Sequence, residues 1–306
     1  MQKQSPPKLR IKNLPRFIVF SAISLILIIL AIMTLFFLTT KLTETFNAQR
    51  QILQTSSTVN TAETNTTKAT NSKNIKETLK KNPAAQANDP LADIKSRLRT
   101  DDTEGIKVIF LTFDDGPTER TGEVLDLLNT YNVKGTFFTT LHDGESAKAM
   151  YNRIVDEGHT LANHTSSHDY SLYNNPDDFY ADVDKLDQYQ MKITGLEQTS
   201  HVFRFPGGSL NANETCALGI VDQGWNYSDW NVSSGDGCAD PPPSEVIAQN
   251  VINGCHDHDV SVVLCHAELK EQTRAALPTV IETLQDEGYT FLPMENDYTY
   301  PRQLQI

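Results

Sequence analysis

Short apolar runs alternate with amphipathic patterns from about residue 105 to the C-terminus. The runs are typical of buried strands, and the segments between them repeat apolar residues three and four positions apart, as helices do. The expected strands cover 106–112, 135–140, 160–163, 202–206, 225–229, 260–265 and 289–293. The expected helices cover 119–131, 145–157, 177–193, 212–223, 245–253 and 271–287. Repeated β/α units of this kind predict a parallel sheet.

A different pattern, an apolar run without any charge, covers residues 17–38 and is long enough to cross a bilayer as one helix. Five cations precede it, so the positive-inside rule makes residues 1–16 a basic cytoplasmic tail. We expect a single-pass anchor in the cell membrane, with the rest of the chain outside. A cleaved signal peptide is the alternative, but the run is longer than a usual signal core and no small-x-small cleavage site follows it.

Residues 39–100 are rich in Thr, Asn, Ser, Gln and Lys and poor in aromatic residues. This composition predicts a flexible extracellular stalk, which as a random coil of some sixty residues would span about 45 Å. A domain of residues 101–306 on such a stalk could reach a polymer of the cell envelope.

Charge is unevenly distributed along the chain. The first hundred residues hold 15 Lys and Arg against 5 Asp and Glu, whereas the remaining residues hold 11 against 34. The outer part is therefore strongly acidic, which excludes nucleic acid as a partner. We infer no protein partner from the sequence.

Candidate catalytic residues begin at the end of the first expected strand. Asp114 and Asp115 lie in the sequence TFDDGP, and His164 and His168 form a His-x₃-His pair further on. One carboxylate and two imidazoles suit a catalytic metal with open coordination positions, and a second carboxylate then remains beside it. Either motif alone is also typical of a turn or a helix surface, but their coincidence indicates a hydrolase.

Further polar residues follow other expected strands, namely Arg204, Asp229 and His266. Barrels of β/α units carry their chemistry at the carboxyl ends of the strands. Because so many polar residues would meet at one mouth, we expect a distorted or incomplete (β/α) barrel instead of a doubly wound sheet.

These motifs, in this order, resemble the NodB-homology polysaccharide deacetylases, also called carbohydrate esterase family four, over nearly all of residues 105–295. The resemblance implies that Asp114 is the catalytic base and that His266 is the acid. It also implies that a metal is held by Asp115, His164 and His168. Zinc is the expected ion, and cobalt or nickel would fit similar ligands.

The family's arginine motif falls on Arg204, its Asp-Trp motif on Asp229-Trp230 and its Leu-x-His motif on Leu264-Cys265-His266. We expect Arg204 to keep Asp114 ionised and Asp229 to favour the imidazolium form of His266. Trp230 would offer a flat face to a sugar ring, and Leu264 would line a pocket for the acetyl methyl group.

Two positions depart from the family pattern. Pro206-Gly207-Gly208 stands where many members have Pro-Tyr-Gly, which removes a side chain from the rim of the site. The backbone N–H of Gly207 is nevertheless the expected oxyanion donor. Ala267-Glu268 follows His266 in place of the usual Asp, so the surroundings of the acid are expected to differ.

The combined interpretation is a metal-dependent hydrolase, anchored in a bacterial membrane, that removes N-acetyl groups from an amino-sugar polymer of the envelope, with peptidoglycan favoured. One alternative moves the same chemistry to chitin oligosaccharides or acetylated xylan. Another is a carbohydrate-binding envelope module without turnover.

Four cysteines, Cys216, Cys238, Cys255 and Cys265, lie in the outer part of the chain, where three disulfide pairings are open. Cys238 with Cys255 is the favoured pair. Cys265, inside an expected strand, is interpreted as a buried thiol.

Overall fold

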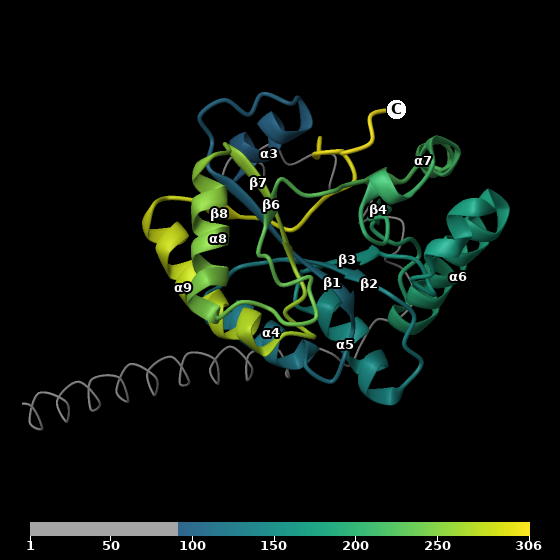
Figure 1. Ribbon diagram of the computed structural model, residues 1–306, viewed down its shortest axis with the longest axis horizontal. Helices are drawn as coiled ribbons and strands as arrows, with labels where there is room; N and C mark the ends of the chain where they lie inside the picture. The colour runs from purple at the N-terminus through teal and green to yellow at the C-terminus, as the bar shows by residue number, and fades with distance from the viewer. Residues whose placement is uncertain (1–90) are drawn as a thin grey trace, which may run out of the picture. The chain divides into compact units, whose positions relative to one another are not determined.

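The computed structural model describes residues 91–306 of the protein (Figure 1). The expected basic tail, the transmembrane helix at 17–38 and the stalk up to residue 90 lie outside the described residues. Between residues 91 and 306, no helix is both long and apolar enough to cross a bilayer.

Eight parallel strands form a single sheet in the described domain. The strands are β1 (Val108–Gly116), β2 (Thr136–Thr139), β3 (Thr160–Asn163), β4 (Val202–Phe203), β5 (Asn226–Tyr227), β6 (Val232–Ser233), β7 (Val260–Cys265) and β8 (Thr290–Phe291). The predicted parallel sheet is confirmed. The expected strands at 202–206, 225–229 and 289–293 are shortened to two residues each, and β6 was not expected.

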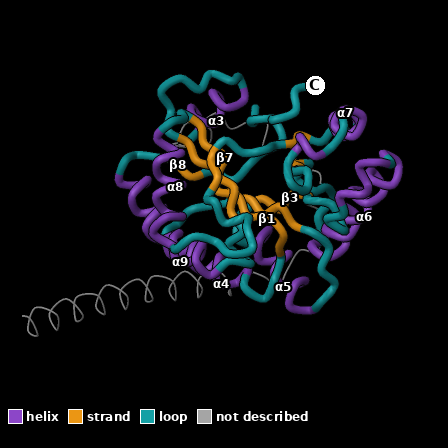
Figure 2. The backbone as a smooth tube through the Cα atoms, in the orientation of Figure 1, coloured by secondary structure: helices purple, strands orange, loops and turns teal. Residues whose placement is uncertain are grey.

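Helices separate all strands except β5 and β6 and lie around the sheet, as Figure 2 shows. They are α3 (Ala92–Arg99), α4 (Thr121–Thr130), α5 (Glu145–Asp156), α6 (Pro176–Thr194), α7 (Glu214–Asp222), α8 (Ser244–His256) and α9 (Glu271–Asp286), with short 3₁₀ turns η1 (Tyr170–Asn174) and η2 (Ser209–Asn211). Local signals set several boundaries. Pro176 at the first helical position starts α6, and Gly195 in the left-handed conformation ends it.

The sheet is curled but open. Its strand order is β5-β4-β3-β2-β1-β7-β6, and the pairings of the described strands do not join β5 to β6. One edge of β1 pairs with β7, so the other edge is shared by β8 near Val108 and by β2 from Thr112 onward. The expected incomplete barrel is therefore an open, parallel half-barrel.

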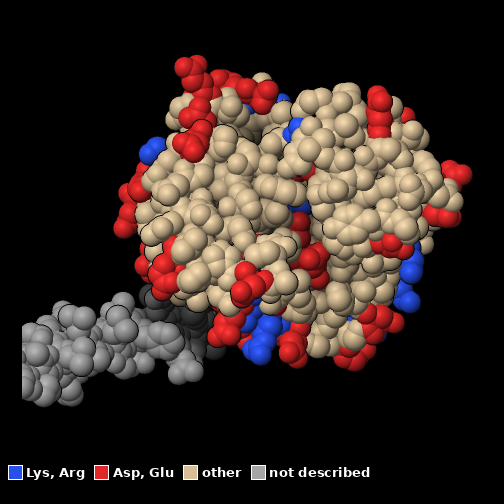
Figure 3. Space-filling view, in the orientation of Figure 1, with Lys and Arg blue, Asp and Glu red and all other residues tan. Residues whose placement is uncertain are grey.

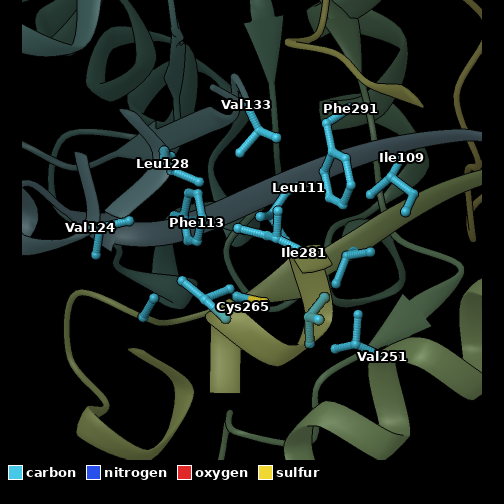
Figure 4. Close-up of a cluster of buried hydrophobic side chains, with 14 of the residues drawn as sticks. Ile109, Leu111, Phe113, Val124, Leu128, Val133, Val251, Cys265, Ile281 and Phe291 are labelled. Atoms are coloured by element: carbon cyan, nitrogen blue, oxygen red, sulfur yellow. The ribbon is translucent and has the colours of Figure 1, made fainter. Parts of the chain in front are cut away.

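Successive residues of β1 point to opposite faces of the sheet, as strand geometry requires. Ile109, Leu111 and Phe113 enter a core formed with α4, α5, α8 and α9, and Figure 4 shows them beside residues of that core. Val108 and Phe110 enter a second core on the other face. Thr112 and Asp114 continue this second face, so the same face changes from apolar to polar toward the carboxyl end of the strand.

Helix α3 lies in the stretch that the sequence assigned to the stalk. Its Leu98 is buried in the second core, and Arg99 donates hydrogen bonds to Asp297 and Glu295 near the C-terminus. The folded domain thus begins before residue 101. The helix is mostly polar, which is why its composition resembled a tether.

The four cysteines are free thiols. Cys216, Cys255 and Cys265 are buried, whereas Cys238 is exposed. The favoured Cys238–Cys255 disulfide is therefore not formed, and the interpretation of Cys265 as a buried thiol is confirmed.

Candidate active site at the carboxyl ends of the strands

The carboxyl ends of four strands bring the main candidate residues together. Asp114 and Asp115 lie in the last three residues of β1, His164 directly follows β3, Arg204 follows β4 and His266 follows β7. Figure 3 shows the described domain hollowed on one face, with Asp and Glu side chains on the floor of the hollow. The predicted meeting of these residues at one mouth is confirmed for all five.

Asp115, His164 and His168 form a cluster with the geometry of a metal site. Their ligand atoms all lie within 4.8 Å of one another, with Asp115 Oδ1 3.6 Å from His164 Nε2 and 3.3 Å from His168 Nε2. Asp115 Oδ1 is buried and has no hydrogen-bond partner. Because a buried carboxylate oxygen is rarely left unpaired, this atom fits a metal ligand.

The orientation of His164 is fixed by a backbone carbonyl. Its Nδ1 lies 2.8 Å from the carbonyl oxygen of Arg204, which can only accept, so Nδ1 carries the proton and Nε2 presents its lone pair to the cluster. Burial is the main reason why the pKa of His164 is lowered to about 3. The imidazole is therefore neutral, as a metal ligand must be.

The backbone around this cluster adopts unusual dihedral angles. Asp115, Thr165 and His168 have φ values of 74°, 66° and 53°, in the left-handed region that residues other than glycine seldom enter. Such strain persists only where the surrounding structure imposes it, and it concentrates at functional sites. Two of these three residues, Asp115 and His168, belong to the cluster itself.

Asp114 is buried and paired with a fully buried Arg204. Arg204 Nη1 lies 2.8 Å from Asp114 Oδ1 and also donates to Thr112 Oγ1, while Nε donates to the carbonyl of Ser228. Burial raises the pKa of Asp114 more than Arg204 lowers it, so this pKa lies above its ordinary value. The expected pairing of Arg204 with Asp114 is present. However, the lowering of the Asp114 pKa by Arg204 is smaller than its raising by burial, so Arg204 alone does not keep this carboxyl ionised.

The carboxylate beside His266 belongs to Asp236, and the sequence analysis missed this residue. Asp236 accepts hydrogen bonds from His266 Nδ1 at 2.8 Å, from the His266 backbone N–H and from Thr273 Oγ1. Burial opposes the charged imidazolium, but the hydrogen bond to Asp236 and nearby carboxylates outweigh it, so the pKa of His266 is raised. Its Nε2 lies 3.9 Å from Asp115 Oδ2.

The expectation that Asp229 pairs with His266 is wrong. The buried carboxylate of Asp229 accepts instead from the backbone N–H and the hydroxyl of Ser209 and from the backbone N–H of Gln303. Asp229 thus ties the loop after β4 to the C-terminal segment, and its own carbonyl accepts from Arg204 Nη2. Both of its oxygens are occupied by these contacts.

Replacing Asp236 with Asn is expected to move the alkaline limb of the pH–rate profile to lower pH, because the raised pKa of His266 depends on the hydrogen bond to this carboxylate. The profile of kcat/KM for acetate release would measure the shift. Asp240→Asn, an exposed carboxylate in the same loop, is the matched control. An unchanged alkaline limb in the Asp236 variant would contradict the pairing as the source of the raised pKa.

The three expected substrate contacts occupy different positions. Gly207 is exposed with φ of 71°, and its N–H donates no hydrogen bond within residues 91–306. Trp230 is partly buried against the second core, with Arg204 Cζ 5.8 Å from its ring. Leu264 is nearly buried on β7, opposite Thr112 of β1.

Glu268, which follows His266 after one alanine, is a buried carboxyl against the turn after Asp115. Its Oε2 accepts from Thr121 Oγ1 and the Thr118 N–H, whereas Oε1 has no partner. A side chain at Gly116 would overlap it, because a Cβ there would lie 1.8 Å from Oε2. Burial, as the main cause, raises the pKa of Glu268 to about 7.

This raised pKa predicts a pH-dependent loss of stability. From about pH 4.5 to about pH 7 the unfolded chain releases the Glu268 proton and the folded chain retains it, so stability falls by on the order of 3 kcal/mol as pH rises. Glu268→Gln should remove this part of the dependence, which urea unfolding across that range would show, with the exposed Glu197→Gln as control. Parallel pH dependences for wild type and Glu268→Gln would contradict the prediction.

Comparisons with known proteins identify relatives of the chain. The family model for polysaccharide deacetylase matches residues 101–219. A peptidoglycan-N-acetylglucosamine deacetylase of Bacillus cereus is 31% identical over 201 residues, which are 64% of this chain and 72% of that protein. The peptidoglycan-N-acetylmuramic acid deacetylase PdaA of Bacillus subtilis is 28% identical over 206 residues, 65% of this chain and 74% of that one.

Among solved structures, the catalytic domain of a peptidoglycan N-acetylglucosamine deacetylase from Eubacterium rectale has a TM-score of 0.60 and 37% identity. The match covers 66% of this chain and 94% of that domain. The sequence relatives, the half-barrel and the residues at its strand ends lead to one conclusion. The chain belongs to the polysaccharide deacetylase family, carbohydrate esterase family four, and is a deacetylase hydrolase.

Proposed function

We propose that the protein is a metal-dependent deacetylase that removes N-acetyl groups from an amino-sugar polymer of the cell envelope, with peptidoglycan as its principal substrate. The substrate is suggested by the relatives named above, which act on peptidoglycan. One observation carries the proposal. The cluster of Asp115, His164 and His168 lies next to both proposed proton-transfer groups. Asp114 Oδ2 is 3.8 Å from His164 Nε2, and His266 Nε2 is 3.9 Å from Asp115 Oδ2.

Asp114 is the base in this proposal. Arg204 Nη1 donates both to Asp114 Oδ1 and to Thr112 Oγ1, so an anchored guanidinium orients the carboxylate that receives a proton from the attacking water. A divalent ion held by Asp115, His164 and His168, with zinc the first candidate and cobalt or nickel next, would polarise the acetyl carbonyl, lower the pKa of the water and favour the ionised form of Asp114.

His266 is the acid that protonates the departing nitrogen. An amine leaves only when protonated, and the raised pKa of His266 keeps its imidazolium form available. The backbone N–H of Gly207, an exposed residue of the loop after β4, is the proposed donor to the oxyanion. Trp230 and Leu264 are the remaining proposed contacts, to the sugar ring and to the acetyl methyl group.

Acetate release from purified peptidoglycan tests the proposed function. The full chain, supplied with Zn²⁺, should release acetate, and a chelator should stop the release. Chitin oligosaccharides and acetylated xylan, assayed side by side, distinguish the alternative substrates. A folded protein that binds envelope polymers but releases no acetate from any of the three would instead indicate a carbohydrate-binding module.

Location at the cell membrane is part of the proposal. The apolar run at 17–38 is its basis, with the deacetylase domain facing outward toward the polymer. Fractionation of cells that produce the chain should recover it with membranes, and deletion of residues 17–38 should release it. Recovery of the intact chain only in a soluble fraction would contradict the anchor.

A further inference from the structure

Tyr170 occupies the space that a side chain at position 207 would fill. An ideal Cβ on Gly207 would lie 2.7 Å from Cε1 and 2.9 Å from the hydroxyl oxygen of Tyr170, closer than real Cβ contacts allow. The two residues come from different loops, since Tyr170 begins η1 after β3 and Gly207 follows β4. The glycine therefore makes room for an aromatic ring supplied from elsewhere in the chain.

The ring of Tyr170 is fixed on one side and open on the other. It meets His168 edge-on with 5.4 Å between ring centroids, and it meets Tyr173 edge-on at 6.3 Å. The buried Tyr173 donates a hydrogen bond to the carbonyl of Pro206, which ties the two loops together. Nevertheless 49% of Tyr170 is exposed.

Other exposed apolar side chains lie in the loops around the site. Leu210 is 66% exposed in η2 after β4, and Leu269 is 50% exposed shortly after β7. With Tyr170 they are three of the seven large exposed apolar side chains of the described residues. Because these loops all follow carboxyl ends of strands, the three side chains lie on the side of the domain that holds the cluster.

We propose that Tyr170 positions the substrate, with the exposed part of its ring packing against a pyranose ring of the polymer. A pyranose has an apolar face of C–H groups that suits an aromatic surface, and Tyr supplies such a surface with little loss of side-chain freedom. Since Tyr170 touches both His168 and Gly207, a sugar on it lies next to the residues proposed to act on the acetyl group. This inference rests on the proposed function.

Tyr170→Ala tests this role in the full chain. It should raise KM for a tetramer of N-acetylglucosamine by about tenfold, with kcat and Zn²⁺ affinity nearly unchanged, because only a sugar contact is lost. Tyr170→Phe, which keeps the ring, should behave like wild type, as should Leu218→Ala, an exposed apolar residue on α7. Tetramer binding to the Asp114→Asn protein, measured by titration calorimetry, should weaken equally when Tyr170→Ala is added.

Three results would overturn the role of Tyr170. They are an unchanged KM in Tyr170→Ala, a loss of Zn²⁺ affinity that accounts for its defect, or a Tyr170→Phe variant as impaired as Tyr170→Ala. If wild type releases no acetate from peptidoglycan, chitin oligosaccharides or acetylated xylan, the proposed function fails separately. The calorimetric titration still decides for or against Tyr170 in that case, because it needs no turnover.

Discussion

Replacing Asp114 with Asn is expected to lower kcat for acetate release roughly a thousandfold, which is within the usual contribution of a general base. Asn has nearly the same shape and keeps an oxygen for Arg204 Nη1, 2.8 Å away in the wild type. It cannot accept the proton of the attacking water. Affinity for Zn²⁺ should change little, because Asp114 is not among the three clustered ligands. Steady-state kinetics and a chelator-competition titration would measure both quantities.

Arg204 would lose a charged partner in this variant, so its folding must be checked by thermal unfolding. Asp156→Asn is a matched control, because Asp156 is an exposed carboxylate on α5. Near-normal turnover in a folded Asp114→Asn protein would rule out Asp114 as the base. A large loss of Zn²⁺ affinity would instead place Asp114 among the metal ligands.

His164→Ala is expected to act on the metal itself, with a loss of Zn²⁺ affinity of more than about a hundredfold. Loss of a residue that only hydrogen-bonds a metal ligand lowers metal affinity about ten- to a hundredfold. His164 is itself a proposed ligand, buried and with its Nε2 facing Asp115, so its loss should cost more. Acetate release should fall in parallel when Zn²⁺ is limiting. Competition with a chromophoric chelator measures the affinity directly.

His256→Ala provides the control for this variant, since His256 is an exposed histidine on α8 that pairs with Glu287. It should bind Zn²⁺ as wild type does. Unchanged Zn²⁺ affinity in a folded His164→Ala protein would contradict the assigned ligand set, whatever happened to activity.

The sequence predicted the parts of the site that local patterns determine. The apolar run that ends in Asp114 and Asp115 is a strand whose period-two alternation carries Val108 and Phe110 into the core and Asp114 onto the same face. The spacing of His164 and His168 likewise brings both rings to Asp115. These features depend on strand geometry and on short separations along the chain.

The features that sequence missed depend on contacts between distant segments. Strand β6 has only two residues, and its pairing with Val263 and Leu264 of β7 places the following loop, with Asp236, beside His266. No local period signals so short a strand. The Asp-Trp motif made Asp229 the expected partner of His266, but the carboxylate of Asp229 accepts hydrogen bonds from Ser209 and Gln303 instead.

The predicted boundary between stalk and domain, at residue 100, lies too far along the chain for a similar reason. Helix α3 carries one fully buried apolar residue, Leu98, among charged neighbours, so its composition alone predicts a solvated segment. Its docking depends on the second core and on Arg99 pairing with Glu295 and Asp297, nearly two hundred residues away.

Anomalous X-ray scattering from crystals grown with Zn²⁺ tests the metal centre most directly. The predicted result is one strong peak about 2.0–2.2 Å from an oxygen of Asp115 and from a ring nitrogen each of His164 and His168. A peak bound by other residues, or no peak between these three side chains at saturating Zn²⁺, would contradict the assignment.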